Sequence, residues 1–167
     1  MARLVNQKGL KQVSLTLVGS GHPEYEVLLR NLAEREHLQD FVTFHGPVSK
    51  ENMPALLQQY DVLVFPSIYE EPLARMTQEA MLSGLVVVGT TTGGTGEILK
   101  HGETGLTFAP EDADGLADQV ARLLSDPDLC CILAQAGRQT VLENFTLDKM
   151  VTEMEAYLLD CFARNSQ

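Results

Sequence analysis

Two uninterrupted apolar segments constrain the fold of this chain more than any other feature of its sequence. The first is Val-Leu-Val-Phe at 62–65, which follows Asp61 and is stopped by Pro66–Ser67, and the second is Leu-Val-Val-Val at 85–88. Strands that are apolar on both faces belong to parallel sheets that helices cover on either side. The two segments therefore predict an α/β fold around a buried parallel sheet.

Strand and helix patterns alternate along the rest of the chain. In the segment 23–37, Tyr25, Leu28, Leu29, Leu32 and Ala33 recur with the i, i+3, i+4, i+7 spacing of an amphipathic helix. A short helix is expected after the next strand, with Ser49 as its N-cap. This alternation predicts a doubly wound domain finished by helices. The other expected strands are 12–18, 41–45 and 106–108, and the last expected helices are near 116–124 and 147–162.

Charge and cysteine content exclude several classes of function. The 167 residues carry 12 Lys+Arg against 23 Asp+Glu, a formal net charge of -11, so the general field repels nucleic acids and anionic membranes. Three cysteines and four scattered histidines show no metal-ligand spacing, and the odd cysteine count favours a reducing compartment. No apolar run approaches the ~20 residues of a membrane span. We therefore expect one cytoplasmic domain with no nucleic-acid partner, transmembrane segment, metal or cofactor.

The segment 66–99 carries the most informative motif. It contains Glu71 and Glu79 separated by seven residues, then Ala80–Met81, Gly84, the Val-rich strand, Gly93–Gly94 and Glu97. This pattern resembles the C-terminal, donor-binding domain of family 4 retaining glycosyltransferases, which have the GT-B fold. Further matches at 17–21, 44–48 and 102–106 extend the resemblance over nearly the whole chain. The resemblance implies the Rossmann-like half of a GT-B fold.

The residue types in this motif suit a nucleotide sugar. Carboxylates accept hydrogen bonds from hydroxyl groups, and one carboxylate can hold two neighbouring hydroxyls. If a helix begins at 73–75, Glu71 lies in the loop before it and Glu79 lies in its second turn. The free N–H groups at such a helix start face the phosphates of a ligand. The chemistry therefore fits a ligand that is rich in hydroxyls and carries a pyrophosphate.

The resemblance also implies roles for single residues. Glu71 contacts the transferred sugar and is the implied catalytic residue, and Glu79 binds the ribose hydroxyls. Val48 contacts the nucleotide base through its main chain. Backbone N–H groups of Leu73, Ala74, Arg75 and Met76 bind the pyrophosphate, and Gly93–Gly94 form a tight turn that faces the sugar. No bound metal is implied, because helix dipoles and basic groups offset the charge of the leaving pyrophosphate.

Structural alternatives stay open for most of these residues. Glu79 can pair on a solvated helix, Arg75 can be an exposed structural residue, and Val48 can serve packing alone. Gly93–Gly94 can be an ordinary turn between a loop and a helix. The family commonly has Phe-Gly where this chain has Leu73–Ala74, and glycine lets a backbone approach its ligand closely. The extra methyl group is small, so the expected role of this segment stands.

The first nine residues resemble a second motif of the family but do not match its spacing. In the family, an Arg-Leu…Lys-Gly segment supplies the cations that bind the pyrophosphate, and Arg3 and Lys8 look similar. The strand at 12–18 follows too soon, so we interpret 1–8 as the tail of a helix that ends at Gly9. The sheet would then lack its central first strand and most of its first helix. We expect strands 12–18 and 41–45 to pair directly with 61–65 or to leave an exposed edge.

These inferences predict the donor-binding domain of a retaining glycosyltransferase that moves a sugar from a UDP- or GDP-sugar to an acceptor hydroxyl. The whole chain, 1–167, is then one N-terminally truncated domain without its acceptor-binding domain, and it is inactive alone. We expect the parent enzyme to be cytoplasmic or peripheral to the inner membrane face. The helix at 147–162 would reach the acceptor domain, and its exposed apolar stripe favours self-association. Alternatives are a non-catalytic nucleotide-sugar-binding or docking module and a sugar-nucleotide epimerase.

Overall fold

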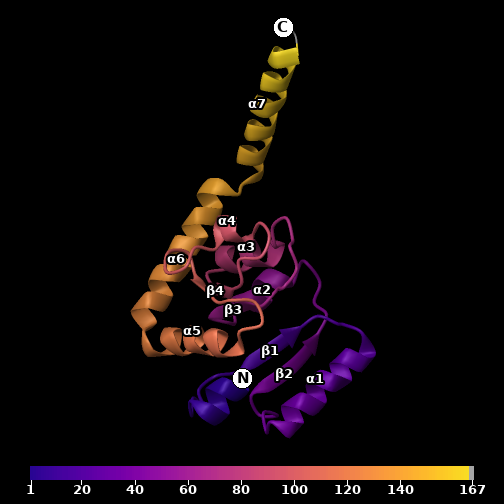
Figure 1. Cartoon of the computed structure of the whole chain (residues 1–167), viewed down its shortest axis with the longest axis vertical. Coiled ribbons are helices and arrows are strands. Elements are labelled where there is room, and N and C mark those ends of the chain that lie inside the picture. The colour runs from indigo at the N-terminus through magenta and orange to yellow at the C-terminus, as the bar shows by residue number, and fades with distance from the viewer. Residues whose placement is uncertain (166–167) are drawn as a thin grey trace.

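Strands and helices alternate in the computed structural model, which describes residues 1–165 (Figure 1). The elements are, in chain order, η1 (Arg3–Gln7), β1 (Leu15–Val18), α1 (Pro23–Arg35), β2 (Val42–Gly46), α2 (Met53–Leu57), β3 (Val62–Phe65), α3 (Arg75–Leu82), β4 (Val86–Gly89), α4 (Thr95–Ile98), β5 (Leu106–Thr107), α5 (Ala113–Ser125), α6 (Pro127–Asn144) and α7 (Leu147–Asn165). The expected α/β architecture is confirmed, because all of the strand pairs are parallel.

The strands form two separate sheets. β1 pairs with β2 in one sheet, and β3, β4 and β5 follow one another in the other. Within the described residues no strand lies between β1 and β3, so each of them keeps one unpaired edge. Direct pairing of strands 12–18 and 41–45 with 61–65 is therefore wrong, and the alternative outcome, an exposed edge, is confirmed.

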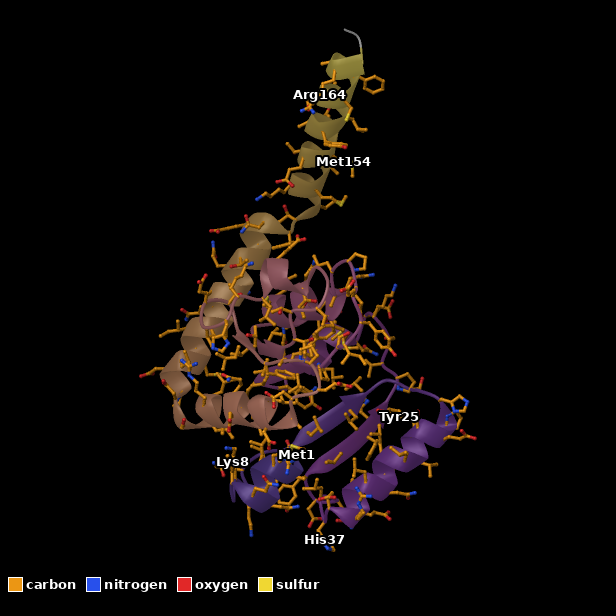
Figure 2. All side chains as sticks on the ribbon, viewed as in Figure 1. Met1, Lys8, Tyr25, His37, Met154 and Arg164 are labelled. Atoms are coloured by element: carbon orange, nitrogen blue, oxygen red, sulfur yellow. The ribbon has the colours of Figure 1, made fainter. Side chains whose placement is uncertain are left out.

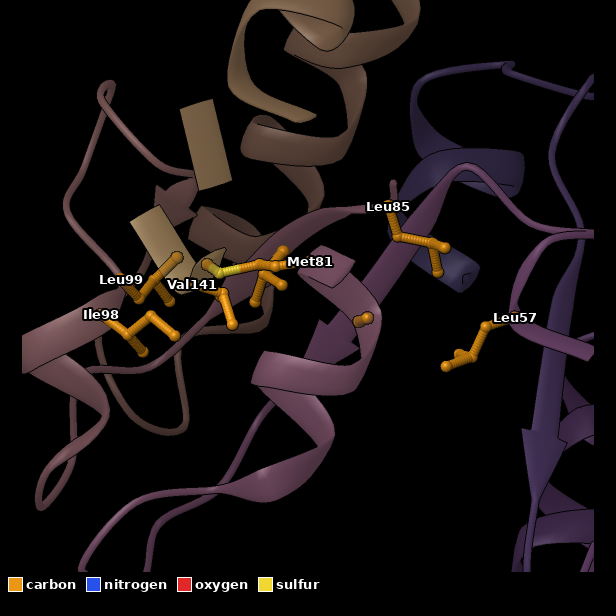
Figure 3. Close-up of a cluster of buried hydrophobic side chains, with 8 residues drawn as sticks. Leu57, Met81, Leu85, Ile98, Leu99 and Val141 are labelled. Atoms are coloured by element: carbon orange, nitrogen blue, oxygen red, sulfur yellow. The ribbon is translucent and has the colours of Figure 1, made fainter. Parts of the chain in front are cut away.

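The core is built on both faces of β4. On one face, Val87 belongs to a cluster that α2, α3, α4 and α6 complete (Figure 3). On the other face, Val86 and Val88 pack with Leu106, Leu123 and Leu133. All side chains of β4 are buried, whereas β3 is only half-buried along its length. The prediction of a strand that is apolar on both faces is confirmed for β4, and β3 is more exposed because it lies at a sheet edge. The first cluster consists of Leu57, Ala80, Met81, Leu85, Val87, Ile98, Leu99 and Val141.

The N-terminal segment is helical and stops at Gly9, as its sequence predicts. Leu4 and Val5 are buried, and Gly9 takes a φ of 69°, the left-handed conformation that ends helices. Its single turn, η1, is a π-helical turn. Arg3 pairs with Asp114 at 2.8 Å and Lys8 with Asp118 at 2.6 Å, and both aspartates lie on α5. The two cations therefore bind α5 in this structure.

The apolar stripe of α1 is largely exposed, which differs from the expectation. Ala33 is buried, but Tyr25, Leu28 and Leu32 are exposed. Val5 of η1 packs with Ala33 and Leu38 near the end of α1, and the apolar side chains of the earlier turns stay exposed. The periodicity correctly identified the helix, but what covers a helix face depends on its neighbours in space.

Ser49 is not the N-cap of α2, so that expectation is wrong. Asn52 occupies the N-cap position, and the Ser49 carbonyl accepts the N–H groups of Asn52 and Met53 at 3.1 Å each. A turn therefore separates Ser49 from the helix. Two hydrogen bonds to the Glu51 carboxyl lower its pKa: the larger effect comes from the backbone N–H of Glu51 and the smaller one from the Ser49 hydroxyl.

The last helix, α7, projects away from the rest of the molecule (Figures 1 and 2). Its large apolar side chains are exposed, from 49% at Leu158 to 71% at Phe162, which confirms the expected exposed stripe. None of the helices in the part that the structure describes has the length and hydrophobicity needed to cross a membrane.

Candidate functional site

The loop 66–74 connects the end of β3 to the start of α3 and carries Glu71. Glu71 is exposed, and Ala74 is the residue that immediately precedes the helix. α3 begins at Arg75, within the expected range, so Glu79 lies in its second turn. The predicted local arrangement, with one carboxylate before the helix and one inside it, is confirmed.

Hydrogen bonds anchor this loop at three points. The hydroxyl groups of Thr90 and Thr92 both donate to the carbonyl oxygen of Ser67. The N–H of Gly94 donates to the carbonyl oxygen of Glu71 at 2.9 Å. The buried Thr77 hydroxyl donates to the carbonyl oxygen of Ala74. Two of these anchors come from the segment after β4, so the ends of neighbouring strands hold the loop in place.

Gly93–Gly94 lie directly against the backbone of this loop. A Cβ on Gly94 would overlap the carbonyl oxygen of Pro72, and one on Gly93 would overlap that of Glu71. Gly93 also has a φ of 57°, which side chains rarely adopt. The structure thus brings Gly93–Gly94 and Glu71 together, and the two glycines are needed for the close approach of two backbones.

The start of α3 offers backbone donors to a ligand. In residues 1–165, the N–H groups of Arg75 and Met76 have no hydrogen-bond acceptor. The side chains of Leu73 and Met76 pack on the core, so these two residues can contact a ligand only through their main-chain groups. Ala74 is only 2% exposed, so its methyl group does not occupy the space in front of the helix. The helix start can therefore hold an anion.

Arg75 and Glu79 form a pair one helical turn apart. Nη2 of Arg75 lies 3.4 Å from Oε1 of Glu79, and the two side chains are 75% and 40% exposed. The solvated pairing that the sequence left as an alternative is therefore present in this structure. Exposed pairs of this kind contribute about 0–1 kcal/mol, so a ligand with better hydrogen bonds can displace Arg75 from Glu79.

Val48 does not belong to the loop that carries Glu71, and the described residues form no metal site. Val48 is half-buried and follows β2, which belongs to the other sheet. Val48 therefore follows a strand of a different sheet from the one that leads into the Glu71 loop. Across the described residues, no group of three or more His, Cys, Asp or Glu side chains could hold a metal ion.

Thr90 and Thr92 are site residues that the sequence did not predict. Both follow the Val-rich strand in a run of three threonines at 90–92, which was the only local signal. Their function as anchors depends on Ser67, which lies 23 residues before Thr90. A contact over this distance in sequence becomes visible only when β3 and β4 pair.

Comparisons with known proteins give a family for the chain. A family model described as "Glycosyl transferases group 1" matches residues 1–140. N-acetyl-alpha-D-glucosaminyl L-malate synthase of Bacillus anthracis is 33% identical over 159 residues, which make up 95% of this chain and 40% of that protein. A GDP-mannose-dependent alpha-(1-6)-phosphatidylinositol monomannoside mannosyltransferase of Mycobacterium tuberculosis is 32% identical over 151 residues, 87% of this chain and 39% of that one.

Solved structures agree with these relatives. The structure of HepE from Anabaena in complex with UDP superposes with a TM-score of 0.84 and 25% identity, covering 90% of this chain and 42% of that one. The chain therefore spans about two fifths of the length of these three proteins.

Replacement of Gly94 by alanine tests the close packing of the two loops. We expect G94A to lower the free energy of unfolding by about 3 kcal/mol, because the new methyl group would overlap the Pro72 carbonyl. The matched control is G96A, whose Cβ would lie 3.6 Å from the Thr91 carbonyl, an ordinary contact, and should change stability by less than about 0.5 kcal/mol. Urea unfolding measures both. Equal stability of the two variants would contradict the packing.

Proposed function

The chain belongs to the glycosyl transferases group 1 family, and we propose that it is the donor-binding part of a retaining glycosyltransferase. One observation carries the proposal: the loop with Glu71 is held against Gly93–Gly94 directly in front of the helix that carries Glu79. This arrangement combines two carboxylates with unpaired backbone donors. The relatives support a nucleotide-sugar ligand, since one is GDP-mannose-dependent by name and the HepE structure contains UDP.

Glu71 is proposed to contact the transferred sugar and to act as the catalytic residue. Its backbone is fixed on both sides, since its N–H donates to the Tyr69 carbonyl at 3.0 Å and its carbonyl accepts from Gly94. In the described chain its carboxylate has no protein hydrogen-bond donor, and the side chain is exposed. A fixed backbone with an available carboxylate suits the binding of sugar hydroxyls.

Glu79 is proposed to bind the ribose hydroxyls of the nucleotide. It lies one turn inside the helix whose first N–H groups would bind the pyrophosphate, so sugar and phosphate groups of one ligand could be reached from one helix. Arg75, once displaced from Glu79, would add positive charge near the phosphates. Leu73, Ala74 and Met76 would contribute through the main chain, and Val48 would contact the base from the loop after β2.

The acceptor site is proposed to lie on a partner region outside this chain. The chain matches about two fifths of each relative, and the apolar face of α7 is exposed. We propose that α7 packs against an acceptor-binding region and that, in its absence, the same face favours self-association. Free thiols at all three cysteines suit a reducing, cytoplasmic compartment.

Loss of the Glu79 charge tests the ribose assignment. We expect E79Q to weaken the binding of UDP-glucose or GDP-mannose by about 10- to 100-fold, since hydrogen bonds to charged groups contribute about 1.5–3 kcal/mol. Isothermal titration calorimetry on the purified chain measures the change. The matched control is E34Q, an exposed glutamate on α1, which should bind like the wild type. Unchanged affinity in E79Q would exclude the assignment.

The proposal also predicts that the purified chain has no turnover by itself. We expect no release of UDP or GDP from UDP-glucose or GDP-mannose above a protein-free blank, because the acceptor site would be missing. Chromatography of the nucleotides after long incubation is the measurement. Release of nucleotide by the chain alone would contradict this part of the proposal, and an isomeric nucleotide sugar would indicate an epimerase.

The exposed face of α7 predicts self-association of the isolated chain. Met154 and Leu158 are adjacent on this face and are 55% and 49% exposed. We expect the wild type to form dimers at micromolar concentration and the double variant M154E/L158E to be monomeric, because buried charges oppose association. Sedimentation velocity distinguishes the two. E153Q, which alters the polar side of the helix, serves as control, and a monomeric wild type would refute the prediction.

A further inference from the structure

The segment after β4 holds the Glu71 loop through a threonine that no functional assignment uses. Thr90 is fully buried, and its hydroxyl donates to the carbonyl oxygen of Ser67, two residues beyond β3. We propose that Thr90 is a positioning residue, which sets the place of Glu71 without touching the ligand. The importance of that placement for ligand binding rests on the role proposed for Glu71 above.

The hydroxyl continues the sheet where the backbone ladder stops. The N–H of Thr90 donates to the Phe65 carbonyl at 3.0 Å, in line with the pairing of β3 and β4. Beyond this point the two strands turn into separate loops. The Thr90 side chain then binds the next available carbonyl of the neighbouring segment, that of Ser67. The start of the loop is thereby tied to the most buried strand of the protein.

A continuous series of hydrogen bonds leads from this anchor to Glu71. The Oγ atom of Ser67 accepts the N–H of Tyr69 at 3.3 Å, and the Tyr69 carbonyl accepts the N–H of Glu71 at 3.0 Å. The Glu71 carbonyl in turn accepts the N–H of Gly94, which lies four residues after Thr90. The contacts form a closed ring that begins and ends in the segment after β4. Loss of the Thr90 hydroxyl removes one of the hydrogen bonds that tie this ring to the Ser67 carbonyl.

Thr92 makes the anchor partly redundant. Its hydroxyl donates to the same Ser67 carbonyl at 3.1 Å and lies 3.3 Å from the Thr90 hydroxyl. Removal of the Thr90 hydroxyl alone should therefore loosen the loop without unfolding it. Valine has the shape of threonine without the hydroxyl, so T90V keeps the packing and removes one donor.

The test compares T90V with the conservative variant T90S and with T104V. Thr104 is also buried, and its hydroxyl donates to the Ile98 carbonyl at 2.6 Å, in a different loop. Amide hydrogen exchange by NMR reports the loop directly. We expect T90V to raise exchange of the Glu71 and Gly94 amides about 10-fold, as the loss of one hydrogen bond predicts, and T90S to stay within about twofold of the wild type. T104V should leave both amides unchanged.

Ligand affinity provides the second measurement. T90V should weaken UDP-glucose or GDP-mannose binding about 3- to 10-fold, and T90S should restore it. T104V should retain it although it loses two hydrogen bonds, one to the Ile98 carbonyl and one from the Lys100 N–H. Unchanged exchange of both amides in T90V overturns the positioning role. If T90V shows faster exchange but the wild-type chain binds neither nucleotide sugar, the positioning role of Thr90 stands and the proposed function is contradicted. If T90V fails to fold, T92V replaces it, with an expected rise of about threefold in exchange at the same amides.

Discussion

Burial of β4 on both faces is the interaction on which the rest of the structure depends. Val87 packs into the cluster with Ala80 and Met81 of α3, while Val86 and Val88 pack into the cluster that α5 helps to build. Helix α6 contributes to both clusters through Val141 and Leu133. A strand surrounded in this way cannot shift without opening two cores, so its carboxyl end is a rigid base for the loops that follow.

The candidate site is built on this rigid end. The loop with Glu71 leaves β3 and is bound to the segment after β4 by the Thr90 and Thr92 hydroxyls and by the Gly94 N–H. The absence of side chains at Gly93–Gly94 allows the two backbones to touch. Functional loops that are held by a buried sheet combine exposure to ligand with fixed geometry, which the proposed binding of a nucleotide sugar requires.

The other half of the molecule is less completely packed. β1 and β2 form their own sheet, and η1 binds α5 through Arg3 and Lys8. The apolar faces of α1 and α7 are exposed, although their periodicity is that of helices that pack against a neighbour. These surfaces are where the chain can accept further protein contacts, and the family relatives are more than twice as long as this chain.

Local sequence patterns were enough to predict the parallel α/β architecture, the start of α3, and the positions of Glu71 before that helix and Glu79 within it. These features follow from local spacing and from the apolar runs, so neighbouring residues suffice to predict them. Three features became visible only in the folded structure: the sheet divides between β1 and β3, the stripe of α1 is exposed, and Ser49 does not cap α2. The same holds for the contact of Thr90 with Ser67 and for that of Gly93–Gly94 with the Glu71 loop. The physical reason is that packing and hydrogen bonds between distant segments depend on which strands pair and which neighbours cover each face, and local spacing carries no information about either.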